Sequence, residues 1–229
     1  FRRVLFRSLK AAPNVPIVTV NADPFSTGLS NSLAKPSGMV TGMSNMGMDL
    51  TAKLVELLRD AVPKVRHVGV LSDGWSLVSK QRNNELQRAA VATKMQLTIV
   101  EVFQPIQVDT ALAGLAKQGA RALIVPSASI LNEVRSRISK FALARGWPLV
   151  ASDPDWADAG AFATYGANRL ALYRRSAYFV DRLLKGAKVS DLPIEQAMYF
   201  ETVVNLRTAK ALGIKVPPIV MVRATRVIE

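Results

Sequence analysis

Acidic, hydroxyl-bearing and tryptophan side chains recur in this sequence directly after short apolar runs. The segment SDGW follows HVGVL, PSAS follows ALIV, and SDPDW follows WPLVA. If the apolar runs are parallel strands, these segments lie beyond the strands' carboxyl ends, where open α/β sheets bind ligands. A carboxylate such as Asp73 or Asp153 suits an ammonium group, while hydroxyls and helix N-terminal amides suit a carboxylate. A tryptophan can cover an apolar side chain or attract an ammonium group. These residue types predict a site for a small zwitterion.

The predicted ligand-binding residues all stand at or just beyond predicted strand ends. They are Asp23, Thr41, Ser44, Asp73, Trp75, Ser127, Ser152, Asp153, Trp156 and Tyr165. A structural explanation exists for the same positions, because helix-capping residues occur there in any α/β fold. Tryptophan is also usually packed inside a protein. The sequence leaves both explanations open.

Residues for covalent or metal chemistry are missing from the sequence. It contains neither a G-x-S-x-G segment, which holds a hydrolase nucleophile, nor a G-x-x-x-x-G-K-[ST] phosphate loop. There is no cysteine, and the single histidine, His67, would need a partner nucleophile and an orienting group to act as a base. The acidic run DPDWAD lacks the glycine and the spacing of a calcium loop. We predict no catalytic residue, no metal and no cofactor.

The elements that would position these residues follow a repeated strand–helix pattern. Short β-branched runs alternate with stretches of helical apolar spacing, which is typical of a parallel sheet with crossover helices. The predicted strands are 17–20, 39–45, 67–72, 97–103, 122–126, 147–152, 161–166 and 199–205. The residues predicted to cap the turn or helix that follows a strand are Asn21 or Asp23, then Asp49, Asp109, Ser129, Asn168 and Asn205. The fold class is therefore α/β.

Two further predictions concern the last third of the chain. The long helix after Asn168 is expected to bury a stripe of Tyr173, Ala177, Val180 and Leu184. The final segment, IVMVRATRVIE, is expected to be extended.

The distribution of strands predicts two lobes of unequal completeness. Residues 63–166 hold about five strands and form a complete α/β lobe, whereas 9–62 hold one or two strands and a crossover helix. A parallel sheet is normally covered on both faces, so 9–62 is interpreted as the remnant of an incomplete N-terminal lobe. Residues 167–229 are predicted to return as a helix, a strand and a tail.

The first eight residues, FRRVLFRS, resemble the in-frame translation of a common sequencing adapter. Residues 1–8 are therefore predicted to be a library scar outside the fold, with native sequence beginning near Leu9. A basic arm for nucleic acid or membrane, or the start of a signal peptide, fits less well. Lys10 and Pro13 interrupt any apolar run that could follow.

The formal net charge of +13 would suit a nucleic-acid partner. The basic residues are, however, spread along stretches with helical apolar spacing, which favours solvated helix faces and no nucleic acid. No apolar run approaches the roughly 20 residues that a membrane helix needs.

Three long blocks of the sequence are similar to a known bacterial family. They are NVPIVTVNADPFSTGLSNSLAKPSGMVTGMSN, LTAKLVELLRDAVPKVRHVGVL and YGANRLALYRRSAYFVDRLLKGAKVSDLPIEQAMYFETVVNLRTAKALGIKVPP. They resemble the substrate-binding proteins of ABC transporters of the tryptophan/tyrosine type, and the similarity runs from Ala12 to Glu229. Ser37 and Met39 depart from the family's SLARPGGNVTG, and SDGWS replaces its usual WNP. These departures leave the ligand open.

The resemblance implies a type I periplasmic-binding fold with two Rossmann-like lobes, whose N-terminal lobe is incomplete here. It implies a small solute, with an amino acid as one candidate, held in the cleft between the lobes by hinge closure. It further implies export to the periplasm and delivery to an ABC permease in the inner membrane. We expect a monomer.

Two other classes remain as alternatives. A ligand-sensing transcription regulator has the same fold, and its DNA-binding helices would lie upstream. A hydrolase or dehydrogenase is disfavoured, because the sequence offers no nucleophile–base set and no dinucleotide loop.

Overall fold

The computed structural model describes residues 2–76 and 78–229 and divides into two compact units. The first unit comprises the chain up to Met48 together with 167–200, and the second comprises 49–166 together with 201–229. The predicted boundary after residue 166 coincides with one of these divisions. The helix at 51–61, expected beside the first lobe, belongs to the second unit, as do the last 29 residues.

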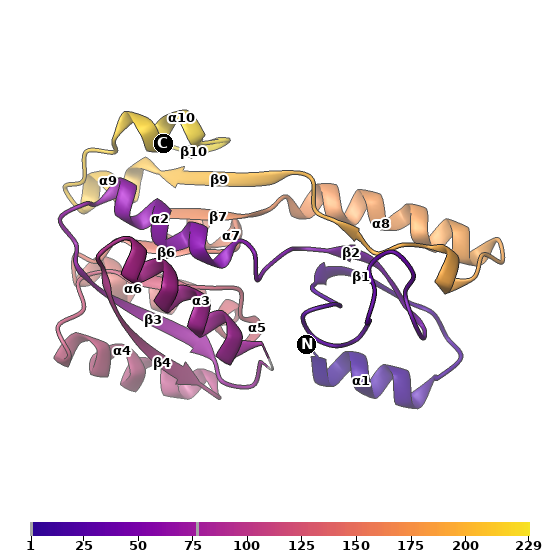
Figure 1. Cartoon of the computed structure of the whole chain (residues 1–229). Helices are drawn as coiled ribbons and strands as arrows, with labels where there is room; N and C mark the ends of the chain where they lie inside the picture. Colours follow the sequence, from indigo (N-terminus) through magenta and orange to yellow (C-terminus); the bar gives the residue numbers. More distant parts are fainter. Residues whose placement is uncertain (1, 77) are drawn as a thin grey trace. The chain divides into compact units, whose positions relative to one another are not determined.

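A mostly parallel sheet forms the centre of the second unit (Figure 1). Its strand order is β10-β9-β7-β6-β5-β3-β4. The strands are β3 (His67–Asp73), β4 (Gln96–Val102), β5 (Leu123–Val125), β6 (Leu149–Ala151), β7 (Ala163–Ala167), β9 (Phe200–Asn205) and β10 (Arg226–Ile228). β3 pairs in parallel with β4 and β5, and β5, β6 and β7 follow in parallel. The carboxyl ends of β3 to β7 therefore meet at one edge.

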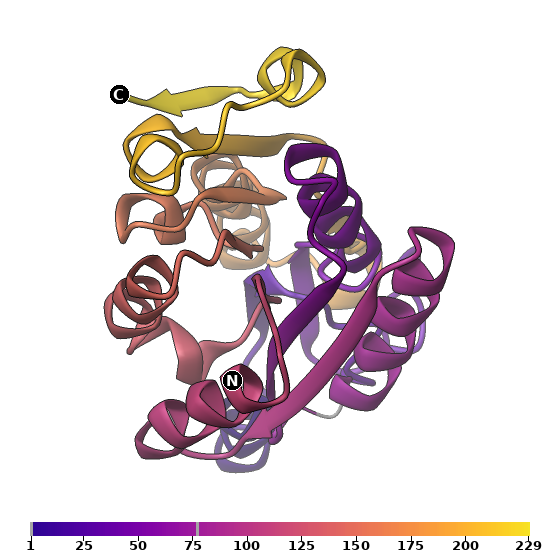
Figure 2. The ribbon, with the colours of Figure 1, turned by 90° about the vertical axis from the view of Figure 1, so that its left-hand side faces the viewer.

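Both faces of this sheet are covered by helices, as Figure 2 shows. Successive residues of β5 alternate between two apolar cores: Ile124 belongs to one, and Leu123 and Val125 belong to the other. Side chains of a strand point alternately to opposite faces, so a strand buried on both sides is a continuous apolar run. This explains why ALIV and WPLVA contain no polar residue.

The helices of the second unit connect its strands. They are α2 (Thr51–Ala61), α3 (Ser79–Ala92), α4 (Val108–Lys117), α5 (Ser129–Asn132), α6 (Arg135–Ala144), α7 (Asp155–Asp158), α9 (Leu206–Ala211) and α10 (Pro218–Arg223), with a 3₁₀ turn at Pro105–Gln107. α2 and α3 pack on one core, and α4, α5, α6 and α7 pack on the other.

The first unit is built on a smaller parallel sheet of order β1-β2-β8. Its elements are α1 (Arg2–Ala11), β1 (Ile17–Ala22), β2 (Val40–Ser44), α8 (Arg169–Leu184), a 3₁₀ turn (Val189–Asp191) and β8 (Glu195–Gln196). α8 packs against β1 and β2. Gly42, at φ +116°, lets the two strands approach, because a Cβ there would overlap the backbone of Thr19. Residues 2–8 of the predicted scar are themselves helical, as part of α1. Phe1 lies outside the described residues.

The predicted helix caps are partly confirmed. Asn168 Oδ1 accepts a hydrogen bond from Ala171 N (2.7 Å), and Asn205 Oδ1 accepts one from Thr208 N (3.0 Å). The caps predicted at Asp49, Asp109 and Ser129 are wrong. α2 begins two residues after Asp49, α4 begins one residue before Asp109, and α5 begins at Ser129 itself. The N-cap positions are Leu50, Gln107 and Ala128, and none of them makes a side-chain cap hydrogen bond.

Two predictions for the last third of the chain are also wrong. The residues that α8 buries are Leu172, Ser176 and Phe179, while the predicted stripe of Tyr173, Ala177, Val180 and Leu184 is exposed. Apolar residues occur on more than one face of this helix, so spacing alone could not select the buried face. The predicted extended tail begins as helix α10 and becomes a strand only at Arg226. In the described part of the chain, no helix is both long and apolar enough to cross a membrane.

Candidate functional site

Polar residues from three neighbouring strands gather at the carboxyl edge of the second unit's sheet. Asp73 ends β3, Ser127 stands two residues beyond β5, and Ser152 and Asp153 follow β6 directly. β3, β5 and β6 are adjacent and parallel, so their following loops lie side by side. The edge predicted from the sequence to bind a ligand is therefore formed within one unit.

The loop after β3 is fixed by Asp73 and by an aromatic contact. Asp73 is nearly buried, and its Oδ1 accepts a hydrogen bond from Trp75 N (2.9 Å). The Trp75 indole donates to the Phe103 carbonyl oxygen (2.6 Å) and meets the Phe103 ring edge-on, with centroids 5.4 Å apart. A Cβ on Gly74 would lie 2.5 Å from that ring, so any larger residue there would displace the Phe103 side chain. Trp75 is 52% exposed and can cover a ligand.

Arg82, in the first turn of α3, is a residue of this edge that the sequence did not reveal. It is 5% exposed, and its Nη1 donates a hydrogen bond to the Ser127 carbonyl oxygen (2.8 Å). Burial lowers the pKa of the Arg82 guanidinium, and the charges of Asp73 and Glu101 partly raise it again. In sequence, an arginine within SKQRNN is typical of a solvated helix face, so no signal could have identified it.

A short polar network extends from Arg82's neighbour along the same edge. Ser72 Oγ donates to Asn83 Oδ1 (3.0 Å), and Asn83 Nδ2 donates to Glu101 Oε1 (3.3 Å). Ser72 and Glu101 are register partners on β3 and β4. This network ties the first turn of α3 to the strand ends and thereby positions Arg82.

The loop after β6 is held against β7 by close backbone packing. Asp153 Oδ1 accepts a hydrogen bond from Asp155 N (3.1 Å) and so closes the first turn of α7. A Cβ at Gly166 would overlap the Ser152 carbonyl oxygen, so this approach requires glycine. Tyr165, half-buried, packs partly on the core beneath the sheet. The side chains of Ser152 and Asp153 remain half-buried at the edge.

Trp156 is placed in the interior of the second unit. It is 1% exposed, belongs to the core on the α6 face, and donates its indole N–H to Asn132 Oδ1 (2.7 Å). A tryptophan whose ring and N–H are both engaged inside the fold serves packing. Of the two tryptophans predicted for the site, only Trp75 reaches the surface.

Three predicted residues lie in the first unit. Asp23 follows β1 and accepts hydrogen bonds from Ser26 N (3.1 Å) and Ser26 Oγ (2.7 Å), as a turn cap does. Thr41 is fully buried within β2 and donates to the Leu192 carbonyl oxygen (2.6 Å). Ser44 ends β2, is buried, and accepts from Met46 N (3.3 Å).

Metal-ligand geometry was not found at either edge. Across residues 2–76 and 78–229, no three histidine, cysteine, aspartate or glutamate side chains stand close enough together to hold a metal ion. The described groups are suited to non-covalent recognition: one buried guanidinium, neighbouring carboxylates, hydroxyls and a surface indole.

Comparison with known proteins identifies the family. Residues 6–228 match the family described as ABC transporter substrate binding protein. A tyrosine-binding protein of Clostridioides difficile is 28% identical over 207 residues, which cover 90% of this chain and 59% of that protein. The chain thus spans less than two thirds of the length of this curated relative.

Two solved structures have the same fold. The ABC domain from Streptococcus pneumoniae in complex with L-Trp superposes with a TM-score of 0.84 at 23% identity, covering 94% of this chain and 74% of that one. The ligand-free, open structure of a substrate-binding protein with adhesive properties from Clostridium difficile gives a TM-score of 0.67 at 26% identity, covering 94% and 72%. The type I periplasmic-binding fold predicted from the sequence is confirmed. The chain belongs to the ABC transporter substrate-binding protein family.

Proposed function

We propose that this chain is the solute-capturing part of a bacterial ABC importer and that its ligand is an amino acid. In this proposal the protein acts in the periplasm as a monomer, binds its ligand by hinge closure, and delivers it to a permease in the inner membrane. Family membership supports the transport role, because such proteins bind small molecules for ABC transporters.

The observation that carries the amino-acid assignment is the pairing of opposite charges at one sheet edge. Arg82 lies near Asp73, and Asp153 follows the next strand but one. An α-amino acid carries a carboxylate and an ammonium group on one carbon, so a site with a cation beside carboxylates is complementary to it. The named ligands of the relatives, tyrosine and L-Trp, belong to this chemical class.

The structure changes the set of residues that we propose for contact with the ligand. Thr41 and Trp156 are left out, because their polar groups are engaged inside their own units. Within the second unit we retain Trp75 as the cover for an apolar side chain. The other residues retained are Asp23, Ser44, Asp73, Ser127, Ser152, Asp153 and Tyr165.

A ligand screen tests this proposal. The Tm of the protein is measured with each proteinogenic L-amino acid and with ribose, glucose and allose, and every hit is titrated by calorimetry. A ligand present at 100 times its Kd stabilises the fold by about 2.7 kcal/mol. We expect an L-amino acid to raise the Tm and no sugar to do so. Stabilisation by sugars alone would contradict the amino-acid assignment.

The Trp75→Phe variant refines the screen. It keeps an aromatic ring against Phe103 but removes the indole N–H and part of the covering surface. Its ligand-free Tm should stay close to that of the wild type, while its affinity for an aromatic amino acid should fall. If the Trp75→Phe variant binds the amino acid with unchanged affinity, Trp75 does not contribute to the binding site.

A further inference from the structure

The Arg82 side chain leaves two of its nitrogen atoms without a partner inside the second unit. Nη1 donates to the Ser127 carbonyl oxygen, but Nε and Nη2 are buried and have no hydrogen-bond partner in the described part of the chain. Asp73 and Glu101 are near enough to act on the charge of the guanidinium, but neither accepts a hydrogen bond from Nε or Nη2. Buried polar groups are normally satisfied, because an unmade hydrogen bond to a charged group is costly.

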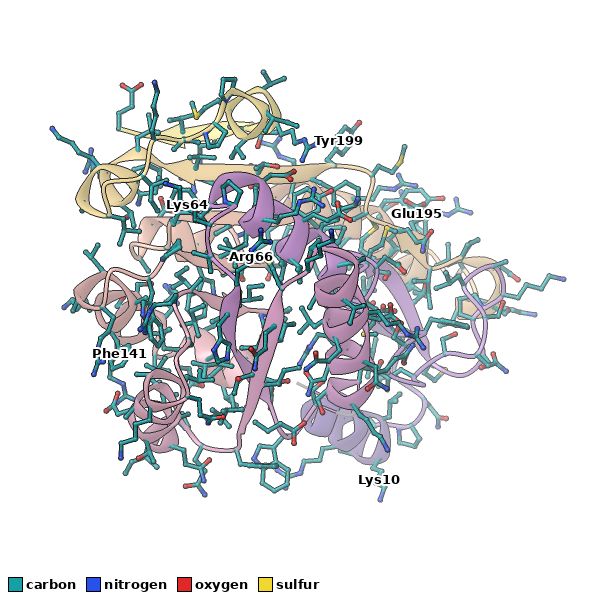
Figure 3. The ribbon with its side chains drawn as sticks, turned by 60° about the vertical axis from the view of Figure 1, so that its left-hand side comes forward. Lys10, Lys64, Arg66, Phe141, Glu195 and Tyr199 are labelled. Carbon is teal, nitrogen blue, oxygen red and sulfur yellow. The ribbon has the colours of Figure 1, made fainter. Side chains whose placement is uncertain are left out.

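The two open donors share one edge of the guanidinium. Nε–H and an Nη2–H point in parallel, and their spacing matches the two oxygens of a carboxylate. Arg175 in the first unit shows this pairing in the same protein. Its Nε donates to Glu195 Oε2 (2.7 Å) and its Nη2 to Glu195 Oε1 (2.5 Å); Glu195 is labelled in Figure 3. Arg82 has the same edge, without the carboxylate.

The position of Arg82 connects this open edge with the candidate site. Its guanidinium is anchored to the loop after β5 through Ser127, and its helix is tied to β3 and β4 through Asn83. Asp73, at the end of β3, supplies the opposite charge nearby. The same strand ends were assigned to ligand binding on independent grounds, namely their place in a parallel sheet.

We propose that Arg82 binds the carboxylate of the ligand through Nε and Nη2. This inference rests on the proposed function and deepens it, because it makes a free carboxylate the group that the site requires. Both nitrogen atoms are shielded from solvent in this structure, so the guanidinium or the side chains around it must shift as the ligand enters. The carboxylate of the ligand would then complete the neutralisation of this buried charge, to which Asp73 and Glu101 contribute without a direct hydrogen bond.

Variants at two arginines of the same helix test the role of Arg82. Arg82→Met keeps an unbranched apolar stem but removes the guanidinium. Arg82→Lys keeps the positive charge but not the pair of parallel N–H donors. Arg88→Met is the matched control, because Arg88 is exposed and pairs with Glu85 on the helix surface. Each protein is titrated with L-tryptophan and L-tyrosine and with their α-carboxamides, L-tryptophanamide and L-tyrosinamide.

We expect the wild type and Arg88→Met to bind the acids and to bind the amides at least tenfold more weakly. Arg82→Met should lose about a hundredfold in affinity for the acids, as for removal of one partner of a buried charge pair, and Arg82→Lys should lose part of it. Unchanged affinity in Arg82→Met, or equal binding of acid and amide by the wild type, would overturn the inference while leaving the proposed function intact.

Two further results separate the inference from the proposed function and from a purely structural role. If neither amino acid binds, the same variants are titrated with acetate, succinate and citrate. If one of these carboxylates binds and its affinity depends on Arg82, the role of Arg82 stands and the amino-acid assignment is rejected. If none of them binds, both the role of Arg82 and the amino-acid assignment are rejected. The ligand-free Tm of Arg82→Met should be unchanged or higher, because a buried charge with two unsatisfied donors is removed. A Tm several degrees lower would assign the guanidinium to the fold instead.

Discussion

At the residue scale, two asparagines close helices through the same side-chain oxygen but in different surroundings. Asn168 caps α8 and is half-buried, whereas Asn205 caps α9, is buried, and also donates from Nδ2 to the Ala157 carbonyl oxygen (2.9 Å). Asn205 therefore joins α9 to the end of α7 as well as ending β9. A side chain that satisfies two buried backbone groups should contribute more to stability than a cap at a helix end alone.

The Asn205→Ala substitution tests this difference. It removes the cap of the Thr208 N–H and one of the two hydrogen bonds that the Ala157 carbonyl oxygen accepts, the other coming from Gly160 N. We therefore expect a loss of about 2 kcal/mol in the free energy of unfolding. Urea denaturation followed by circular dichroism measures the loss. Asp49→Ala is the control, because Asp49 was expected from sequence to cap α2 but the N-cap is Leu50. A loss at Asp49 equal to that at Asn205 would contradict the assigned caps.

The residues of the candidate site show what sequence can predict at this scale. Asp73, Ser127 and Ser152 could be assigned to one sheet edge because strand order and parallel pairing follow from the strand–helix repeat. The burial of Trp156 could not be predicted, since a tryptophan after a strand end has the same sequence context whether it packs inward or outward. The role of Arg82 could not be predicted either, because only the folded structure shows that its Nε and Nη2 are buried without a hydrogen-bond partner.

At the scale of elements, glycines decide how closely neighbouring segments approach. Gly166 lies in β7 where the chain passes the loop after β6, and the Ser152 carbonyl oxygen occupies the space of its missing side chain. Gly114, in the middle of α4, has nothing within 4 Å of the position that a Cβ would take. The two sites therefore predict opposite effects for the same substitution.

Gly166→Ala should destabilise the protein by roughly 1–3 kcal/mol, because an added methyl group must displace backbone in a packed region. It should also weaken ligand binding, since the displaced loop carries Ser152 and Asp153. Gly114→Ala should instead stabilise the protein by about 0.5–1 kcal/mol through the higher helix propensity of alanine. Thermal unfolding and calorimetric titration of both variants provide the comparison. A Gly166→Ala protein as stable as the wild type would show that β6 and β7 are less closely packed than described.

The elements themselves were largely predictable, and the errors have identifiable physical causes. The five strands predicted within 63–166 are all present, because each is a short run rich in apolar or β-branched residues bounded by polar or glycine residues. The buried face of α8 was mispredicted, because the pattern of apolar residues satisfies helical spacing on more than one face. Packing of Leu172 and Phe179 in the core beside β1 and β2 selects between these faces, and that choice is made by tertiary contacts.

At the scale of the whole molecule, the two units differ in the size of their cores. The second unit has two apolar clusters, one on each face of its sheet. The first unit has a smaller cluster around Met43, Leu172 and Phe179, and α8 exposes Leu170, Tyr173 and Leu184. Apolar burial is the main favourable term in folding, so the first unit should have the lower local stability.

Hydrogen exchange measured by mass spectrometry tests this difference. We expect amides of β1 and β2 to exchange faster than those of β5 and β6, because local opening of the first unit exposes less apolar surface. An amino acid that binds both units should slow exchange in the first unit more than in the second, since ligand binding opposes the opening that costs least. Equal protection of the two sheets without ligand would show that the smaller core is sufficient. Slower exchange confined to the second unit would indicate that the ligand is held by that unit alone, through the edge that carries Asp73 and Arg82.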